Sequence, residues 1–398
     1  MNKIPKITAF FALSVLCANH VAAITVSEKA NKLAQENIII DSHIDVPYRL
    51  EEKWVDVTKA TADGDFDYPR AKQGGLNAPF MSIYIPASLD NSANSTKLAD
   101  KLIDYVEAIV GRAPDKFAIA TSTAEVEQQF AKGLISLPLG MENGSPIQGD
   151  MANLKHFYER GIRYITLAHS MANHISDSSY DLRRKWKGLS PFGKELVKEM
   201  NNLGILVDIS HVSDAAFYQA IEISQTPVIA SHSSLRAFTP GFERNMDDAM
   251  IKALGENGGV IQINFGSTFV TKRANAWSKN RSAEQKKAEQ KFGKDSDEYK
   301  AFRTKYSEEN PLPYATLDSV LDHIDHVVKL IGIDHVGIGS DYDGVGDSLP
   351  TDLKDVSTYP NLIQGLLDRG YSDKDIVKIL AGNFIRVWKA NEEYAAKH

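Results

Sequence analysis

Short runs of β-branched and other apolar residues recur along the chain, each bounded by glycine or by residues typical of turns. Eight of these runs predict strands, at Asn37–Ile40, Pro79–Ile85, Leu134–Leu139, Ile162–Leu167, Ile205–Ile209, Pro227–Ala230, Gly259–Asn264 and His335–Ile338. Most of them are separated by stretches in which apolar residues recur at helical spacing. In Thr316–Leu330, the apolar positions are Leu317, Val320, Leu321, Ile324, Val327 and Val328.

Several predicted helices also carry start and stop signals. Ser190 and Pro191 open a helix that Gly204 ends, and Ser213 caps a helix that runs through Ile221. Further helices are predicted at Lys97–Val110, Ser122–Phe130 and Asp247–Leu254. A strand followed by a helix, repeated eight times, predicts one α/β domain with the (β/α)8 TIM barrel fold. A doubly wound open sheet is the alternative, but no Gly-x-Gly-x-x-Gly motif follows the first strand.

One segment interrupts this alternation, between the seventh and eighth predicted strands. Ser278–Asn310 is densely charged, which predicts a solvated helix or a helical hairpin inserted in a loop. The ordinary explanation is a tolerated surface insertion. A lid or a dimer contact is the alternative, because the loop leaves the face of the barrel where active sites lie.

The first 23 residues predict a cleaved signal peptide. Lys3 and Lys6 form a basic region, the apolar stretch 7–17 is too short to span a bilayer, and Val21-Ala22-Ala23 offers a cleavage site after Ala23. An uncleaved anchor and a lipoprotein modified at Cys17 are the alternatives. The domain would then span residues 24–398 of a secreted protein, periplasmic in a Gram-negative bacterium.

Composition restricts the chemistry that this domain can use. With 43% hydrophobic and 24% charged residues and a net charge of −7, the chain is an ordinary globular protein with no indication of a nucleic-acid partner. Its single cysteine is Cys17, so a mature chain of 398 − 23 = 375 residues has no thiol. Any metal must therefore bind to His, Asp or Glu. The polar C-terminus carries no hydrophobic anchor signal, so no membrane anchor is predicted in the mature chain.

Potential metal ligands stand at the ends of six predicted strands. They are His43 and Asp45 after the first, Glu142 after the third, His169 after the fourth, His211 after the fifth, His232 after the sixth and Asp341 after the eighth. Each alone has an ordinary explanation as a cap, a solvated carboxylate or a turn residue. Together they meet at the rim where barrel enzymes keep their active sites. Like charges gathered there are costly unless a cation neutralises them.

Five of these residues suit zinc or a similar divalent ion. Because five protein ligands exceed the three usual at one catalytic zinc, the pattern predicts two ions that share Glu142. His43 and Asp45 would complete one site, and His211 and His232 the other. Two ions about 3.5–4 Å apart can share a hydroxide and lower its pKa, which makes a hydrolytic site.

These residues are similar to those of the membrane (renal) dipeptidase family of zinc peptidases, within the amidohydrolase-like barrels. The matching stretches follow the family's order: Asp41–Asp45, Gly74-Gly75, Gly140–Gly144, Arg163–His169, Asp208–His211, Ser231–Ser234, Arg244-Asn245, Gly258–Val260 and Gly337–Gly344. One departure is Asn143, where the family commonly has a second glycine after the bridging glutamate. As a set the motifs are specific, although each alone is weak.

The resemblance implies two Zn²⁺ ions per subunit, a dipeptide substrate and a homodimer. It also implies roles for three residues outside the ligand set. His169 would polarise the scissile carbonyl or stabilise the oxyanion, Arg244 would bind a substrate carboxylate or oxyanion, and Asp341 would carry a proton from the bridging water to the leaving amine. From the sequence alone, Arg244 is equally consistent with a surface arginine that pairs with Asp247 or Asp248.

The predicted function is hydrolysis of dipeptides, L,D-dipeptides included, by a hydroxide that bridges the two metal ions. One alternative is another amidohydrolase reaction, on N-acyl amino acids, lactones or β-lactams. A non-catalytic periplasmic protein that binds zinc or a solute is the other. His169 and Asp341 argue against it, because zinc storage requires neither.

Overall fold

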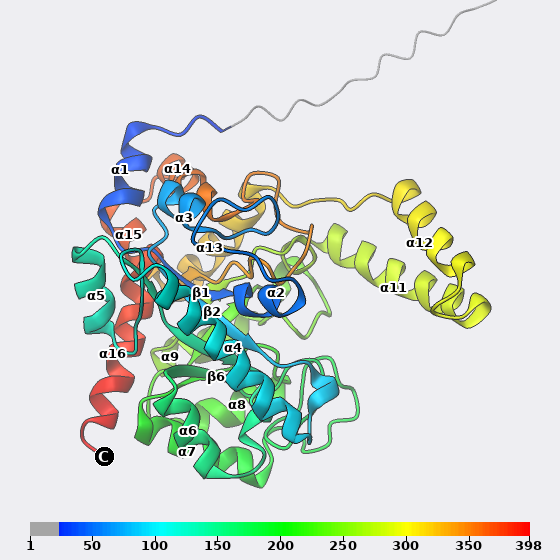
Figure 1. Ribbon diagram of the computed structural model, residues 1–398, viewed down its shortest axis with the longest axis horizontal. Helices are drawn as coiled ribbons and strands as arrows, with labels where there is room; N and C mark the ends of the chain where they lie inside the picture. The colour runs from blue at the N-terminus through cyan, green and yellow to red at the C-terminus, as the bar shows by residue number, and fades with distance from the viewer. Residues whose placement is uncertain (1–23) are drawn as a thin grey trace, which may run out of the picture.

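Eight parallel strands close into a barrel in the computed structural model, which describes residues 24–398 (Figure 1). In chain order they are β1 (Ile40–Ile44), β2 (Ala78–Tyr84), β5 (Leu139–Glu142), β6 (Ile162–Thr166), β7 (Leu206–Asp208), β8 (Ile229–Ser233), β9 (Val260–Ile263) and β10 (Val336–Ile338). Each pairs with the next, and β10 pairs with β1. The predicted (β/α)8 barrel is confirmed. The predicted signal peptide, residues 1–23, lies outside the described residues.

Three strand predictions are wrong in their position. The sixth strand is Ile229–Ser233, so His232 lies within it and not after it. The first strand is Ile40–Ile44, so His43 lies within it. The third predicted strand is two strands, because β4 (Ile135–Leu137) pairs with β3 (Phe117–Ile119) in a separate two-stranded sheet and only β5 enters the barrel. Pro138 separates β4 from β5. Proline has no N–H to donate to a ladder, but its carbonyl accepts a hydrogen bond from the Met81 N–H at 2.8 Å.

Helices surround the barrel, and they include all six that the sequence predicts outside the charged insertion. They are α1 (Glu28–Glu36), α2 (Val46–Glu52), α3 (Tyr68–Gly74), α4 (Ala93–Arg112), α5 (Thr123–Ala131), α6 (Met151–Glu159), α7 (Pro191–Leu203), α8 (Asp214–Ile223), α9 (Asp248–Asn257), α10 (Ser267–Val270), α13 (Leu317–Ile331), α14 (Tyr359–Asp368), α15 (Asp373–Val377) and α16 (Asn383–Ala395). The predicted caps are confirmed. The Ser190 hydroxyl accepts from the Gly193 N–H, and Gly204 ends α7 in the left-handed conformation.

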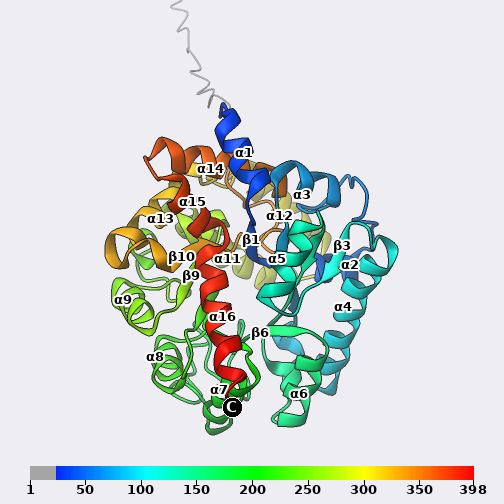
Figure 2. The ribbon, with the colours of Figure 1, turned by 90° about the vertical axis from the view of Figure 1, so that its left-hand side faces the viewer.

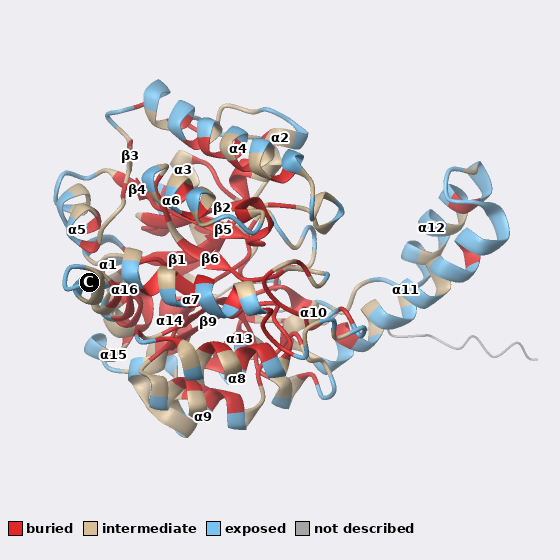
Figure 3. Cartoon of the chain, turned by 90° about the horizontal axis from the view of Figure 1, so that it is seen from below, coloured by how far each residue is buried: buried red, intermediate tan, exposed pale blue. Residues whose placement is uncertain are grey.

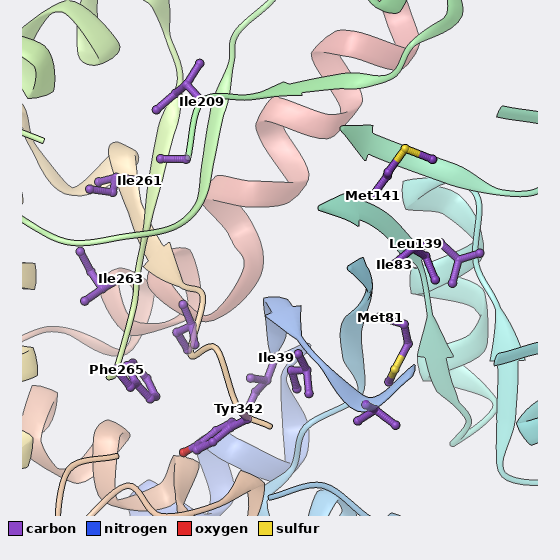
Figure 4. Close-up of a cluster of buried hydrophobic side chains, with 14 of the residues drawn as sticks. Ile39, Met81, Ile83, Leu139, Met141, Ile209, Ile261, Ile263, Phe265 and Tyr342 are labelled. Carbon is purple, nitrogen blue, oxygen red and sulfur yellow. The ribbon is translucent and has the colours of Figure 1, made fainter. Parts of the chain in front are cut away.

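The strands separate two layers of apolar side chains, because successive residues point to opposite faces. Inside the barrel, Phe80 and Tyr164 pack with Phe384 and Trp388 of α16, which covers the amino-terminal end of the barrel (Figure 2). Outside, side chains such as Ile83 fill the space between strands and helices (Figure 4). With one end covered, only the carboxyl end of the barrel is available for a site.

The charged insertion forms a helical hairpin, as predicted. Helices α11 (Lys272–Phe292) and α12 (Asp297–Glu309) extend away from the barrel at the end opposite α16, and most of their residues are exposed (Figure 3). The Trp277 indole N–H donates to the Asn310 carbonyl at 2.9 Å and so ties the two ends of the hairpin together. We call these two helices the α11–α12 hairpin. No helix within residues 24–398 is long and apolar enough to cross a membrane.

Candidate metal centre

The carboxyl ends of four strands bring the five predicted ligands together in a buried cluster. His43 and His232 belong to β1 and β8, and Glu142 is the last residue of β5. Asp45 and His211 follow β1 and β7 closely in the chain. All five side chains are buried, although they come from positions up to 189 residues apart (232 − 43).

The Glu142 carboxylate lies at the centre of this cluster. Its Oε1 atom is 3.1 Å from Nε2 of His211 and 3.3 Å from Nε2 of His232, and its Oε2 atom is 3.3 Å from Nε2 of His43. His43 Nε2 is in turn 3.4 Å from Asp45 Oδ2. One carboxylate therefore faces histidines of both predicted metal sites.

The other two predicted residues of the barrel rim lie beside these five. His169 Nε2 is 3.4 Å from Glu142 Oε1, and His169 forms a possible ligand group with Glu142 and His211. Asp341 forms another with His43 and Asp45, and its Oδ2 atom accepts a hydrogen bond from Asn264 Nδ2 at 2.7 Å. These contacts bring together all seven of the metal-ligand candidates at the strand ends.

The donor atoms fit a cation better than they fit one another. His43 Nε2 and Asp45 Oδ1 are buried without a hydrogen-bond partner within residues 24–398. The Nε2 atoms of His211 and His232 are 2.8 Å apart, so both can carry a free lone pair at this distance only with a cation between them. Ligands of one zinc ion, each bound at about 2 Å, lie roughly 3.3 Å from one another, which is close to the spacing around Glu142. The residues present therefore suit divalent metal ions.

Buried hydrogen bonds aim the histidines at this centre. Tyr164 Oη lies 2.7 Å from Nδ1 of His43. The Ser231 hydroxyl lies 2.8 Å from Nδ1 of His232 and 2.6 Å from Asp208 Oδ2. Partners of this kind leave Nε2 free for a metal. No role was predicted for Tyr164, Asp208 or Ser231, although all three lie in stretches that match the family, or for Asn264 beside Asp341. All four lie within or at the end of predicted strands, which is the signal that could have found them.

Electrostatics favour metal-binding protonation states at Glu142, His211 and His232. Burial alone would raise the pKa of Glu142, but His43, His169, His211 and His232 hold it well below its usual range. Burial lowers the pKa of both His211 and His232 well below the usual value. An ionised Glu142 with neutral His211 and His232 is the form that binds a metal ion. Burial alone would lower the pKa of His43, but Tyr164, Glu142 and Asp45 raise it well above its usual value, so a metal ion must displace a proton there. Burial, together with the neighbouring Asp45 carboxylate, raises the pKa of Asp341 well above its usual range.

Three residues at the site have left-handed backbone conformations that side chains rarely adopt. They are Asn143 with a φ of 76°, His211 with 68° and Asp341 with 65°. Asn143 stands where the resembled family commonly has glycine. Asparagine tolerates this conformation, and here its amide donates to the Ile85 carbonyl at 2.9 Å. The departure at Asn143 therefore preserves the turn after Glu142.

Arg244 is a buried residue beside the metal centre. Its guanidinium donates to the Ser233 hydroxyl at 2.7 Å and to the His232 carbonyl at 2.6 Å, while its Nε atom has no partner within residues 24–398. Asp247 instead pairs with Arg236, and Asp248 with His326. The alternative of a surface arginine paired with Asp247 or Asp248 is therefore wrong.

An open cavity of about 1180 Å³ leads from solvent to part of the metal centre. Its floor includes Asp45, Glu142, His169 and His211, while the base of the α11–α12 hairpin forms part of its wall. No local sequence pattern points to this wall, because its side chains meet the site only when the loops fold over the barrel.

Comparisons with known proteins agree with the geometry. A family model for membrane dipeptidase (peptidase family M19) matches residues 27–398. An uncharacterised dipeptidase of Schizosaccharomyces pombe is 31% identical over 93% of this chain and 84% of its own length. The dipeptidase aclJ of Aspergillus oryzae is 34% identical over 81% of this chain and 69% of its own.

Solved structures share the fold. The probable dipeptidase PvdM from Pseudomonas aeruginosa superposes with a TM-score of 0.79 at 25% identity, covering 92% of this chain and 98% of that one. A metallo peptidase from Rhodobacter sphaeroides, liganded with a phosphinate mimic of the dipeptide L-Ala-D-Ala, gives a TM-score of 0.73 at 23% identity, over 89% of this chain and 99% of that one.

Proposed function

This chain belongs to the membrane dipeptidase family of metallopeptidases, peptidase family M19, and from that premise we propose that it hydrolyses dipeptides with two zinc ions at the Glu142 cluster. His43, Asp45 and Glu142 would hold one ion, and Glu142, His211 and His232 the other. The observation that carries the proposal is the position of Glu142, whose two oxygens each face a histidine of a different predicted site.

The side chains around the ligands have distinct roles in this proposal. Zinc ions held by these residues would supply Lewis-acid chemistry and would lower the pKa of a bound water. His169 donates a hydrogen bond to the carbonyl oxygen as negative charge develops on it. Arg244 uses the guanidinium donors left free by Ser233 and His232 to bind the substrate carboxylate. Asp341, held by Asn264, carries a proton to the leaving amine.

The test is metal analysis combined with a substrate panel on the mature chain. We expect about two zinc ions per subunit and turnover of L,L-dipeptides. L,D-dipeptides belong in the panel because the Rhodobacter protein was crystallised with a mimic of one. Turnover of N-acyl amino acids without any dipeptide hydrolysis would contradict the proposal and favour a different amidohydrolase reaction.

We also propose that the protein is exported and acts as a homodimer. Both proposals rest on the sequence, through the signal peptide at residues 1–23 and the resemblance to the family. Amino-terminal sequencing of the exported protein should begin at Ile24. Light scattering after gel filtration should give twice the subunit mass, and a single subunit mass would contradict the dimer.

A further inference from the structure

The cavity above the metal centre is larger than a dipeptide requires. Its volume of about 1180 Å³ exceeds the range of roughly 300–1,000 Å³ that is usual for pockets that bind drug-sized ligands. The cavity extends to the α11–α12 hairpin, which contributes Trp277, Ser278, Arg281 and Ser307 to the lining. A substrate bound at the metals therefore has room to extend toward these residues.

Charge is distributed unevenly in this cavity. Its lining includes six carboxylates, of Asp45, Glu52, Glu142, Asp341, Asp343 and Asp347. Arg281 is the only lysine or arginine among the lining residues that the structure describes. The hairpin therefore introduces one cation into an otherwise acidic cavity, at some distance from the metal ligands in the chain and in the fold.

The position of Arg281 is fixed without neutralising its charge. Its guanidinium lies over the Trp277 ring at 5.2 Å from the centroid, and the hydrogen bond to Asn310 holds that ring in place. Within residues 24–398, the Arg281 Nε atom is buried without a hydrogen-bond partner. A fixed arginine with free donors matches the planar geometry of a carboxylate.

A second cavity, of about 310 Å³, adjoins the first at this point. It shares Arg281 and Ser307 with the main cavity, and its other lining residues are Lys300, Arg303 and Thr304 of α12. Three cations and two hydroxyl groups face this space, and no carboxylate of the described chain lines it. Lys300 contacts Asp297 at 3.2 Å, while the two arginines occur in no ion pair of the described chain. Together these groups provide donors for an anion.

We propose that Arg281, with Arg303 and Lys300 behind it, forms an anion subsite that selects dipeptides carrying a second carboxylate. The inference rests on the proposed function, in which Arg244 binds the C-terminal carboxylate near the metals. A dipeptide has only one such group. The anion that reaches Arg281 must then belong to an acidic side chain that projects away from the scissile bond.

Matched substrates that differ only in charge test this subsite. Ala-Glu is compared with Ala-Gln, and Glu-Ala with Gln-Ala, by kcat/KM. We expect kcat/KM to be about tenfold higher for the acidic member of at least one pair. This factor corresponds to the lower end of the free energy of a charge-assisted hydrogen bond, as expected at a partly exposed site. Arg281→Gln should abolish this preference, because it raises KM of the acidic partner far more than KM of the neutral one. Arg273→Gln is the control, because Arg273 is exposed on the same helix and lines neither cavity.

A binding measurement separates failure of the subsite from failure of the proposed function. Glutarate is titrated into the intact protein while Trp277 fluorescence is followed, with uncharged glutaramide as the matched probe and Trp277→Phe to assign the signal. We expect Trp277 fluorescence to change with glutarate but not with glutaramide, and we expect this change to be lost in Arg281→Gln. If no dipeptide is hydrolysed, this response still supports the subsite. If dipeptides are hydrolysed, the proposal is overturned when Arg281→Gln shows the same preference for acidic dipeptides as the unmodified protein. If no dipeptide is hydrolysed, it is overturned when Arg281→Gln binds glutarate as well as the unmodified protein does.

Discussion

The hydroxyl proton of Ser231 can be donated to only one of the two groups beside it. Asp208 can only accept when ionised, so the proton goes to its carboxylate and the serine oxygen accepts from Nδ1–H of His232. That tautomer leaves the lone pair of Nε2 directed at Glu142. Ser231 therefore acts as a positioning residue for a predicted metal ligand, although it does not touch the metal centre itself.

Replacing Ser231 with alanine should therefore weaken metal binding. We expect metal affinity to fall roughly 10- to 100-fold, the usual range for loss of a partner behind a ligand. Competition with a chelator, followed by elemental analysis, measures the change. Ser231→Thr keeps the hydroxyl and should recover most of the affinity. Unchanged affinity in the alanine variant would show that Asp208 and Ser231 do not set the His232 tautomer.

Glu142 offers the most direct residue-level test of the two-metal proposal. In Glu142→Gln, the side chain keeps its size but loses the charge that faces His43, His211 and His232. We expect the bound metal to fall by at least one ion per subunit and turnover to fall by about three orders of magnitude or more. Glu159→Gln, an exposed glutamate on α6, is the control. A fully metallated Glu142→Gln protein would rule out the bridging role.

At the scale of elements, the loop after β10 is held against α2 and the loop that follows it. Asp343 pairs with Arg49 of α2 at 2.8 Å and accepts from the Asp65 backbone N–H at 2.6 Å. This contact places Asp341 and Gly344 above β1. A Cβ atom on Gly344 would overlap the carboxylates of Asp341 and Asp45. Gly344 is therefore required for the close approach of this loop to the site.

Gly344→Ala should lower activity without removing the fold. The added methyl must displace one or both carboxylates, which lie among the predicted catalytic and ligand groups. We expect kcat to fall at least tenfold, because a displacement of about 1 Å at a reacting group can cost about 100-fold. Circular dichroism checks the fold. Gly111→Ala, at an exposed position of α4, is the control, since no atom lies within 4 Å of the corresponding position. Full activity in Gly344→Ala would show that the loop yields at no functional cost.

The same contact makes stability depend on pH. Burial and the adjacent Asp343 raise the pKa of Asp65 from its ordinary 3.8 to about 7. Because the folded protein binds this proton more tightly than the unfolded chain, the group favours folding at low pH. That contribution is lost as pH rises from about 4 through 7.

Asp65→Asn should therefore stabilise the protein at pH 8 more than at pH 5. Asparagine imitates the neutral acid and can still accept the hydrogen bond from the Asp343 N–H. We expect Tm to rise by about 1–2 °C at pH 8, as roughly 1 kcal/mol would give in a domain of this size, and to change little at pH 5. Thermal unfolding at both pH values checks this. An equal shift at both values would mean that Asp65 titrates normally.

At the scale of the whole molecule, the barrel and the α11–α12 hairpin are separable. The barrel has its own core on both faces of the strands, whereas the hairpin is mostly exposed and touches the barrel near its base (Figure 3). Its function would then lie in the wall that it contributes to the cavity. The sequence predicts this insertion as a tolerated surface feature, with a lid or a dimer contact as the alternative. In the structure, its residues form part of the wall of the cavity above the metal centre.

Replacing residues 278–309 with a short Gly-Ser linker should leave the barrel folded. We expect thermal unfolding to remain cooperative, because the removed residues supply little of the core. KM for dipeptides should rise several-fold as the cavity loses a wall. A protein that no longer folds would show instead that the hairpin is an integral part of the barrel.

The sequence by itself determined the order of the helices and strands and the types of side chain at the strand ends. Periodicity and caps are local properties, so the eight strands, the main helices and the helical insertion could be predicted from short windows. Polar residues at the carboxyl ends of parallel strands must share one rim, so His43, Glu142, His211 and His232 could be grouped from the order of the strands alone.

Only the tertiary structure decided how these groups contact one another. The hydrogen bonds of Tyr164, Ser231 and Asn264, and the wall formed by Trp277 and Arg281, join segments far apart in the chain. The tertiary structure also decided that β4 stays outside the barrel. The sequences of β4 and β5 both favour strands, and only the closure of eight parallel strands selects β5 for the barrel. Barrel closure and loop packing depend on contacts across the whole fold, which no local pattern encodes.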